Sequence, residues 1–143
     1  GLFILVGVLE EKGVIEWIAR NVFLRIGDNP YVIVLVVLWV SGIASGFLDN
    51  IPFTITMIPI VRLILESNPI PNDILWWSLS LGACLGGNLT MIGASANIVS
   101  IGMAKKFNQN ISFLEFMKAS AVITIITLLI ASVYLTVYLW VSL

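Results

Sequence analysis

Long apolar runs alternate with short polar breaks along this chain, and the runs define the helices that we expect. The main runs are 1–9, 31–48, 53–65, 74–104 and 119–143. The run 31–48 is rich in β-branched residues, which would favour a strand in water. In lipid the unpaired backbone groups of a strand edge are too costly, so a helix is expected there. The pattern therefore predicts an all-α membrane protein.

The first 28 residues predict two different helical segments. Residues 1–12 read as the end of a transmembrane helix that begins earlier in a longer protein. Residues 14–26 carry Glu16, Arg20 and Arg25, so they are too short and too charged to cross ~30 Å of hydrocarbon. We expect an interfacial helix there, with Trp17 at the depth of the lipid headgroups.

Composition supports lipid as the solvent. The chain has 143 residues, of which 59% are hydrophobic and 10% charged, with a mean hydropathy of +1.07. Soluble domains have about 25% charged residues, and a soluble helical bundle would need charged helix faces. A net charge of −1 argues against nucleic acid binding. Without histidine and with one cysteine, Cys84, enzyme and metal chemistry fit poorly, and Cys84 is expected to be a small packing residue.

The first polar interruption is Asp49-Asn50, between two apolar helices. If both helices cross the membrane fully, these residues form a tight loop without function. If the pair is re-entrant, its tip lies inside the protein and Asp49 faces a cavity. The spacing allows both, although Asn50 and Pro52 leave backbone groups free and Thr54 adds a hydroxyl.

The second interruption lies in the run 74–104, which has more than the ~20 residues that one span requires. Its middle, 82–97, is small and polar. Gly82, Gly86 and Gly93 fit a close helix-packing face, whereas the polar side chains fit an unwound centre that lines a binding site. These polar side chains are Asn88, Thr90, Ser95 and Asn97.

Two stretches carry a resemblance to a known family: LDNIPFTITMIPI (48–60) and LGACLGGNLTMIGASANIVSIGMA (81–104). They resemble the melanosomal P protein and its microbial relatives, which belong with arsenite permeases and D-type sodium/proton antiporters in the ion transporter superfamily. The resemblance covers essentially the whole chain. It implies the C-terminal half of a citrate-transporter-like domain, one of two inverted repeats. The implied parts are the interfacial helix 14–26, a re-entrant hairpin 31–66, a broken helix 73–106 and a closing helix 112–141.

The resemblance also implies which residues bind the substrate or ion. Dicarboxylate transporters of this superfamily carry Ser-Asn-Thr at the hairpin tip, where this chain has Asp49, Asn50 and Ile51, so a titratable group replaces a hydroxyl. Sodium binding of that type is in doubt, with Asn50 and Asn97 as its candidates. The expected binding residues are Asp49, Asn50, Thr54, Asn88, Thr90, Ser95 and Asn97, and the expected backbone-lining residues are Gly86, Gly87 and Gly93.

The function that follows is secondary active transport of an inorganic ion or small anion by alternating access, coupled to protons or sodium. A sodium/proton antiporter, an anion channel of the same fold and a purely structural subunit are the alternatives. We expect no cofactor beyond the coupling ion. The expected partners are the lipid bilayer, the N-terminal half of the same transporter and a second copy in a homodimer. The protein would be multi-pass, in a plasma, inner or organelle membrane.

Overall fold

Five helices make up the well-described part of the chain. The computed structural model describes residues 29–68 and 70–142, together with residues 4, 8, 11–14, 17 and 21. Within these residues it is helical and contains no strand, which confirms the all-α class there. The segments predicted at 1–12 and 14–26 fall largely outside the described residues and stay predictions. The helices are α3 (Pro30–Ser45), α4 (Asn50–Ser67), α5 (Asn72–Gly86), α6 (Ser95–Lys106) and α7 (Phe113–Ser142).

Local capping chemistry fixes several helix ends. Asn29 caps α3 by accepting a hydrogen bond from the Tyr31 backbone N–H at 3.0 Å, and Pro30 follows in the first turn, where its missing N–H is harmless. At α7, the Ser112 backbone N–H donates to Glu115 Oε2 at 2.9 Å, and the Glu115 N–H donates to Ser112 Oγ at 3.3 Å. This reciprocal pair is a capping box, so α7 begins within one residue of the predicted start.

Close packing between α3 and α5 depends on glycine. A Cβ added at Gly82 would lie 2.5 Å from the Leu38 carbonyl oxygen, and one added at Gly86 would overlap the backbone of Gly42. Small residues allow membrane helices to approach in this way. The contact brings the end of α3 beside the end of α5, which is where both apolar runs are interrupted.

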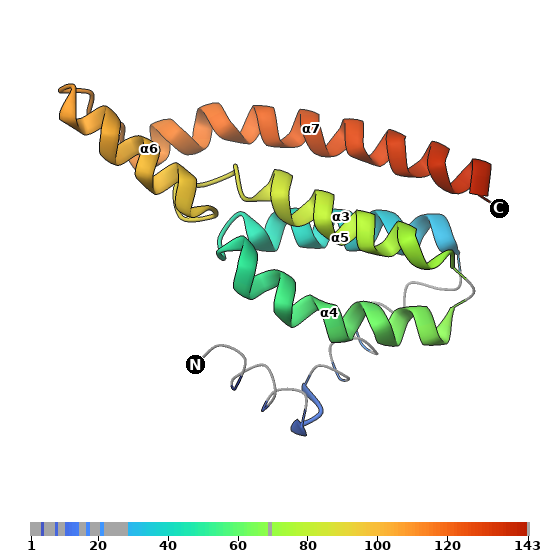
Figure 1. Ribbon diagram of the computed structural model, residues 1–143. Helices are drawn as coiled ribbons and strands as arrows, with labels where there is room; N and C mark the ends of the chain where they lie inside the picture. The colour runs from blue at the N-terminus through green and yellow to red at the C-terminus, as the bar shows by residue number, and fades with distance from the viewer. Residues whose placement is uncertain are drawn as a thin grey trace.

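The helices α4 and α7 lie on opposite sides of the α3–α5 pair (Figure 1). The Trp39 indole N–H on α3 donates to Ser132 Oγ on α7 at 3.1 Å. In contrast, α6 projects beyond the other helices, and none of its residues is buried. The largest fully buried side chains are Ile33, Val34, Val37, Leu38, Ile60, Ile64, Ile74, Leu75, Leu135 and Leu139.

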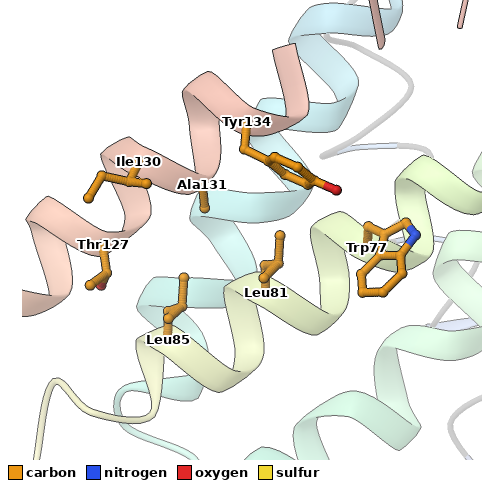
Figure 2. Close-up of a pocket in the computed structure, with 7 residues that line it drawn as sticks. All are labelled: Trp77, Leu81, Leu85, Thr127, Ile130, Ala131 and Tyr134. Carbon is orange, nitrogen blue, oxygen red and sulfur yellow. The ribbon is translucent and has the colours of Figure 1, made fainter. Parts of the chain in front are cut away.

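Large apolar side chains cover the outside of α7. Val133 is 65% exposed and Trp140 is 74% exposed. An apolar groove of about 460 Å³ lies between α5 and α7. Figure 2 shows Trp77 of α5 opposite Tyr134 of α7, and Leu81 opposite Ala131. Both α4 and α7 are long and apolar enough to cross a membrane. Such apolar surface is unfavourable against water and suited to lipid.

Candidate functional site

The two interruptions predicted from the sequence meet in space. Thr90 Oγ1, between α5 and α6, donates at 2.5 Å to the Gly46 carbonyl oxygen, between α3 and α4. Ser95 Oγ, at the start of α6, donates at 3.1 Å to Asp49 Oδ2, just before α4. We call residues 45–50 and 83–97 the tip–break cluster, because they join the tip of the α3–α4 hairpin to the break between α5 and α6.

Asn50 binds the hairpin tip to the break. Its amide faces the carbonyl oxygens of Ala83 and Gly93, each at 3.0 Å, and Ser45 Oγ at 2.5 Å. Carbonyl oxygens only accept, so the amide nitrogen is the group that faces them. Ser45 Oγ in turn donates to the Ala83 carbonyl at 2.7 Å. The amide expected to be a ligand therefore acts here as a cross-link between two segments.

Asn97 and Thr90 hold the break itself. Asn97 Nδ2 donates to the carbonyl oxygens of Gly87 and Thr90, at 3.0 and 2.9 Å. Thr90, which is 1% exposed, accepts at Oγ1 from the Gly93 backbone N–H at 3.1 Å. An unwound segment leaves backbone groups without helical partners, and these side chains satisfy several of them.

Two of the three glycines predicted to line the site lie at its centre. A Cβ added at Gly93 would lie 2.6 Å from the Gly87 carbonyl oxygen and 2.9 Å from that of Gly46, and one added at Gly87 would overlap the Asn50 side chain. Gly86, the third, belongs to the contact between α5 and α3. The break therefore requires residues without a side chain.

Asp49 and two neighbours form the outward-facing part of the cluster. Asp49 caps α4, its Oδ1 accepting from the Ile51 backbone N–H at 3.4 Å, while Oδ2 accepts from Ser95 on α6. One carboxylate thus touches the starts of two helices, where partial positive charge accumulates. Asp49 is partly exposed, and Ser95 and Asn88 are exposed. These are the polar groups that a solute could reach.

Two side chains lie differently from what the sequence suggested. Thr54 lies outside the tip–break cluster and lines a groove between α4 and α5. Cys84, expected to be a packing residue, is exposed in the same groove, because α4 leaves this face of α5 partly uncovered. Ser45 was missed, since a single hydroxyl at the end of an apolar run gives no signal of its own.

Metal ligands are few in the described part of the chain. No group of three or more His, Cys, Asp or Glu residues comes together there. Sodium binding at Asn50 and Asn97 stays a prediction; in the arrangement above, both amide nitrogens face backbone carbonyls.

Comparison with known proteins identifies the family of this chain. Residues 1–143 match the model of the citrate transporter family. An uncharacterized transporter of Mycobacterium tuberculosis is 42% identical over 137 residues, which are 94% of this chain and 32% of that protein. The 46 kDa membrane protein of Mycobacterium leprae is 43% identical over 137 residues, with the same two shares. The P protein of Sus scrofa is 41% identical over 144 residues, which are 95% of this chain and 17% of that protein.

The chain thus spans about a third of the length of these mycobacterial relatives. No solved structure matches it significantly. The match to the P protein confirms the resemblance drawn from the two motifs, and the names of the relatives indicate a transporter rather than an enzyme. With its whole length matched by one family model, this chain belongs to the citrate transporter family of integral membrane transport proteins.

Proposed function

We propose that the tip–break cluster is part of the site at which a secondary active transporter binds a small inorganic ion or anion. The observation that carries this proposal is the Asp49 carboxylate, which contacts the first residues of both α4 and α6. Two helix starts from separate segments converge on one partly exposed charge, in a chain of a transporter family. Converging ends of interrupted helices are how many transporters bind their solutes.

Asp49 would serve as the proton-binding group in this mechanism. An ionised carboxylate within a bilayer is costly, so it needs a partner, water or a proton. The start of α4 and the Ser95 hydroxyl supply hydrogen-bond partners for this carboxylate. Protonation removes the charge before the site moves through the apolar barrier. Proton uptake on one side and release on the other would couple the proton gradient to transport.

Alternating access requires the hairpin and the broken helix to move together. The hydrogen bonds from Asn50 and Thr90 across the two segments support such a joint movement. In this proposal the α3–α4 hairpin is re-entrant, and its tip lies within the membrane. Because this chain spans about a third of its mycobacterial relatives, the rest of such a transporter would complete the site.

The test is Asp49→Asn in the full-length transporter, reconstituted in vesicles and assayed for uptake across a pH series. Asparagine is also a good helix cap, so the substitution removes the charge and keeps the fold. We expect uphill uptake to fall by about tenfold or more and to lose its pH dependence. Asp73→Asn, at the start of α5, is the matched control and should transport normally.

Unchanged uptake with unchanged pH dependence in Asp49→Asn would contradict the proposal. Comparison of citrate, arsenite, sodium and chloride gradients in the same vesicles would identify the solute. A channel of the same fold would conduct only down a gradient, so accumulation against a gradient separates the two mechanisms.

A further inference from the structure

A second groove runs along α5, on the side that faces α4. Its larger part has a volume of about 590 Å³ and includes Thr54 and Arg62 from α4 and Ser80 and Cys84 from α5. A smaller hollow of about 290 Å³ shares Arg62 and Trp76 with it. Because the two hollows share these side chains, they adjoin, and we call them together the α4–α5 groove.

The inner end of the α4–α5 groove reaches the tip–break cluster. Ala83 lines the groove, and its carbonyl oxygen is bound by the Asn50 amide within the cluster. Thr54 lies one helical turn after Asn50. Arg62 and Glu66 follow Thr54 by roughly 12 and 18 Å along the α4 axis. The groove therefore leads from the connection after α4 to the cluster.

The lining of this groove differs from that of the groove between α5 and α7. The α5–α7 groove presents almost only apolar side chains (Figure 2), which lipid tails can cover without loss. The α4–α5 groove also has a mostly apolar lining, but among its apolar side chains it presents the hydroxyls of Thr54 and Ser80, a thiol and a guanidinium. Polar and charged groups that face hydrocarbon are costly. The difference favours water in the α4–α5 groove.

Arg62 sets the charge of the larger, inner hollow of this groove. Among the described residues that line the larger hollow, it is the one with a charged side chain; Glu66 lines only the outer hollow, which it shares with Arg62. A guanidinium matches the geometry of carboxylates and oxyanions. A bound lipid phosphate would also suit Arg62, but it would leave the deeper hydroxyls of Thr54 and Ser80 unexplained.

We infer that the α4–α5 groove is a water-filled route by which a small anion, a carboxylate or an oxyanion, reaches the tip–break cluster. Arg62 selects for negative charge along this route. The inference rests on the proposed function, because it takes the cluster as the transport site. It adds the sign of the solute's charge and the path that the solute takes.

Cys84 provides the probe, because its exposed thiol lies in the groove beside Ala83. The full-length transporter is reconstituted with any other cysteine replaced by serine. Labelling rates of Cys84 are measured with an anionic reagent, sulfonatoethyl methanethiosulfonate, and a cationic one, trimethylammonioethyl methanethiosulfonate. Each reagent is added from the side of the connection after α4. Arg62→Gln should lower the anionic-to-cationic rate ratio by about tenfold, because a fixed charge steers the two reagents in opposite directions.

Three variants serve as controls for this experiment. Arg62→Lys keeps the charge and should keep the ratio. Lys105→Gln removes a positive charge from the far end of α6 and should leave the ratio unchanged. Cys84→Ser should abolish labelling. Citrate should slow labelling by the anionic reagent in the wild type and have no such effect in Arg62→Gln.

Three results would overturn the inference. If Cys84 reacts only with a lipid-soluble maleimide and with neither charged reagent, the groove is filled by lipid. If the rate ratio is unchanged in Arg62→Gln, or citrate gives no protection in the wild type, Arg62 does not select a free anion. Labelling is measured without transport, so its failure is distinct from failure of the Asp49→Asn uptake test.

Discussion

The tip–break cluster contains two sets of polar side chains that look alike in the sequence and differ in the structure. The inner set consists of Ser45, Asn50, Thr90 and Asn97, which bind backbone carbonyls of the cluster. The outer set consists of Asp49, Asn88 and Ser95, whose side chains bind no backbone carbonyl of the described residues. An amide or hydroxyl at an interrupted helix therefore does not by itself identify a ligand.

The difference follows from what an interruption requires. An unwound segment away from water must satisfy its free backbone groups, and the inner set does this with side chains. Only polar side chains that do not bind the free backbone groups are available to bind a solute. The comparison predicts that changes in the inner set mainly affect stability, while changes in the outer set mainly affect transport.

The largest effect is expected where the two interrupted runs touch. Gly86→Ala places a methyl group against the backbone of Gly42, which cannot move aside without separating α3 from α5. We expect a loss of about 3 kcal/mol or more in the free energy of unfolding, with low yield of folded protein. Gly102→Ala is the matched control, because a Cβ there meets nothing within 4 Å. If Gly86→Ala were as stable as Gly102→Ala, the result would contradict the close contact between Gly86 and Gly42.

A smaller effect is expected for the inner set. Asn50→Ala leaves the carbonyl oxygens of Ala83 and Gly93 without this donor, so we expect a loss of about 2–3 kcal/mol in the free energy of unfolding. Asn88→Ala removes the same side chain at an exposed position and should change stability by less than about 0.5 kcal/mol. Equal losses from both substitutions would remove the distinction between the two sets.

The smallest effect is expected for Ser95→Ala, in the outer set. It removes one exposed hydrogen bond to Asp49, so the free energy of unfolding should stay within about 0.5 kcal/mol of the wild type. Uptake should fall by about two- to fivefold, because the carboxylate loses one neutral donor. A large loss of stability without any change in uptake would place Ser95 in the inner set instead.

Much of the helical layout could be predicted from the sequence. The apolar run that begins at residue 31 gives the start of α3 within one residue, and the closing helix 112–141 that the resemblance implies gives the start of α7 within one residue. The break is narrower than the polar stretch 82–97, since Gly82 and Gly86 remain helical and pack against α3. Glycine serves both close packing and unwinding, so the pattern alone does not separate them.

The division of the site into two sets could not be predicted in the same way. Whether Asn50 faces a carbonyl or a solute depends on where Ala83 and Gly93 lie, and they are more than 30 positions away in the sequence. The exposure of Cys84 has the same origin, because it depends on how far α4 covers α5. Both features depend on contacts between distant segments, and such contacts leave no periodic pattern in the sequence.

The most direct test compares Asp49→Asn with Asn97→Ala in the same reconstituted preparation, measuring both the free energy of unfolding and uphill uptake. Asparagine preserves the cap of α4, so Asp49→Asn should unfold within about 0.5 kcal/mol of the wild type and transport little. Asn97→Ala should lose about 2 kcal/mol, because two carbonyl oxygens lose their donor. Wild-type transport by Asp49→Asn, or a loss of stability as large as that of Asn97→Ala, would contradict the account.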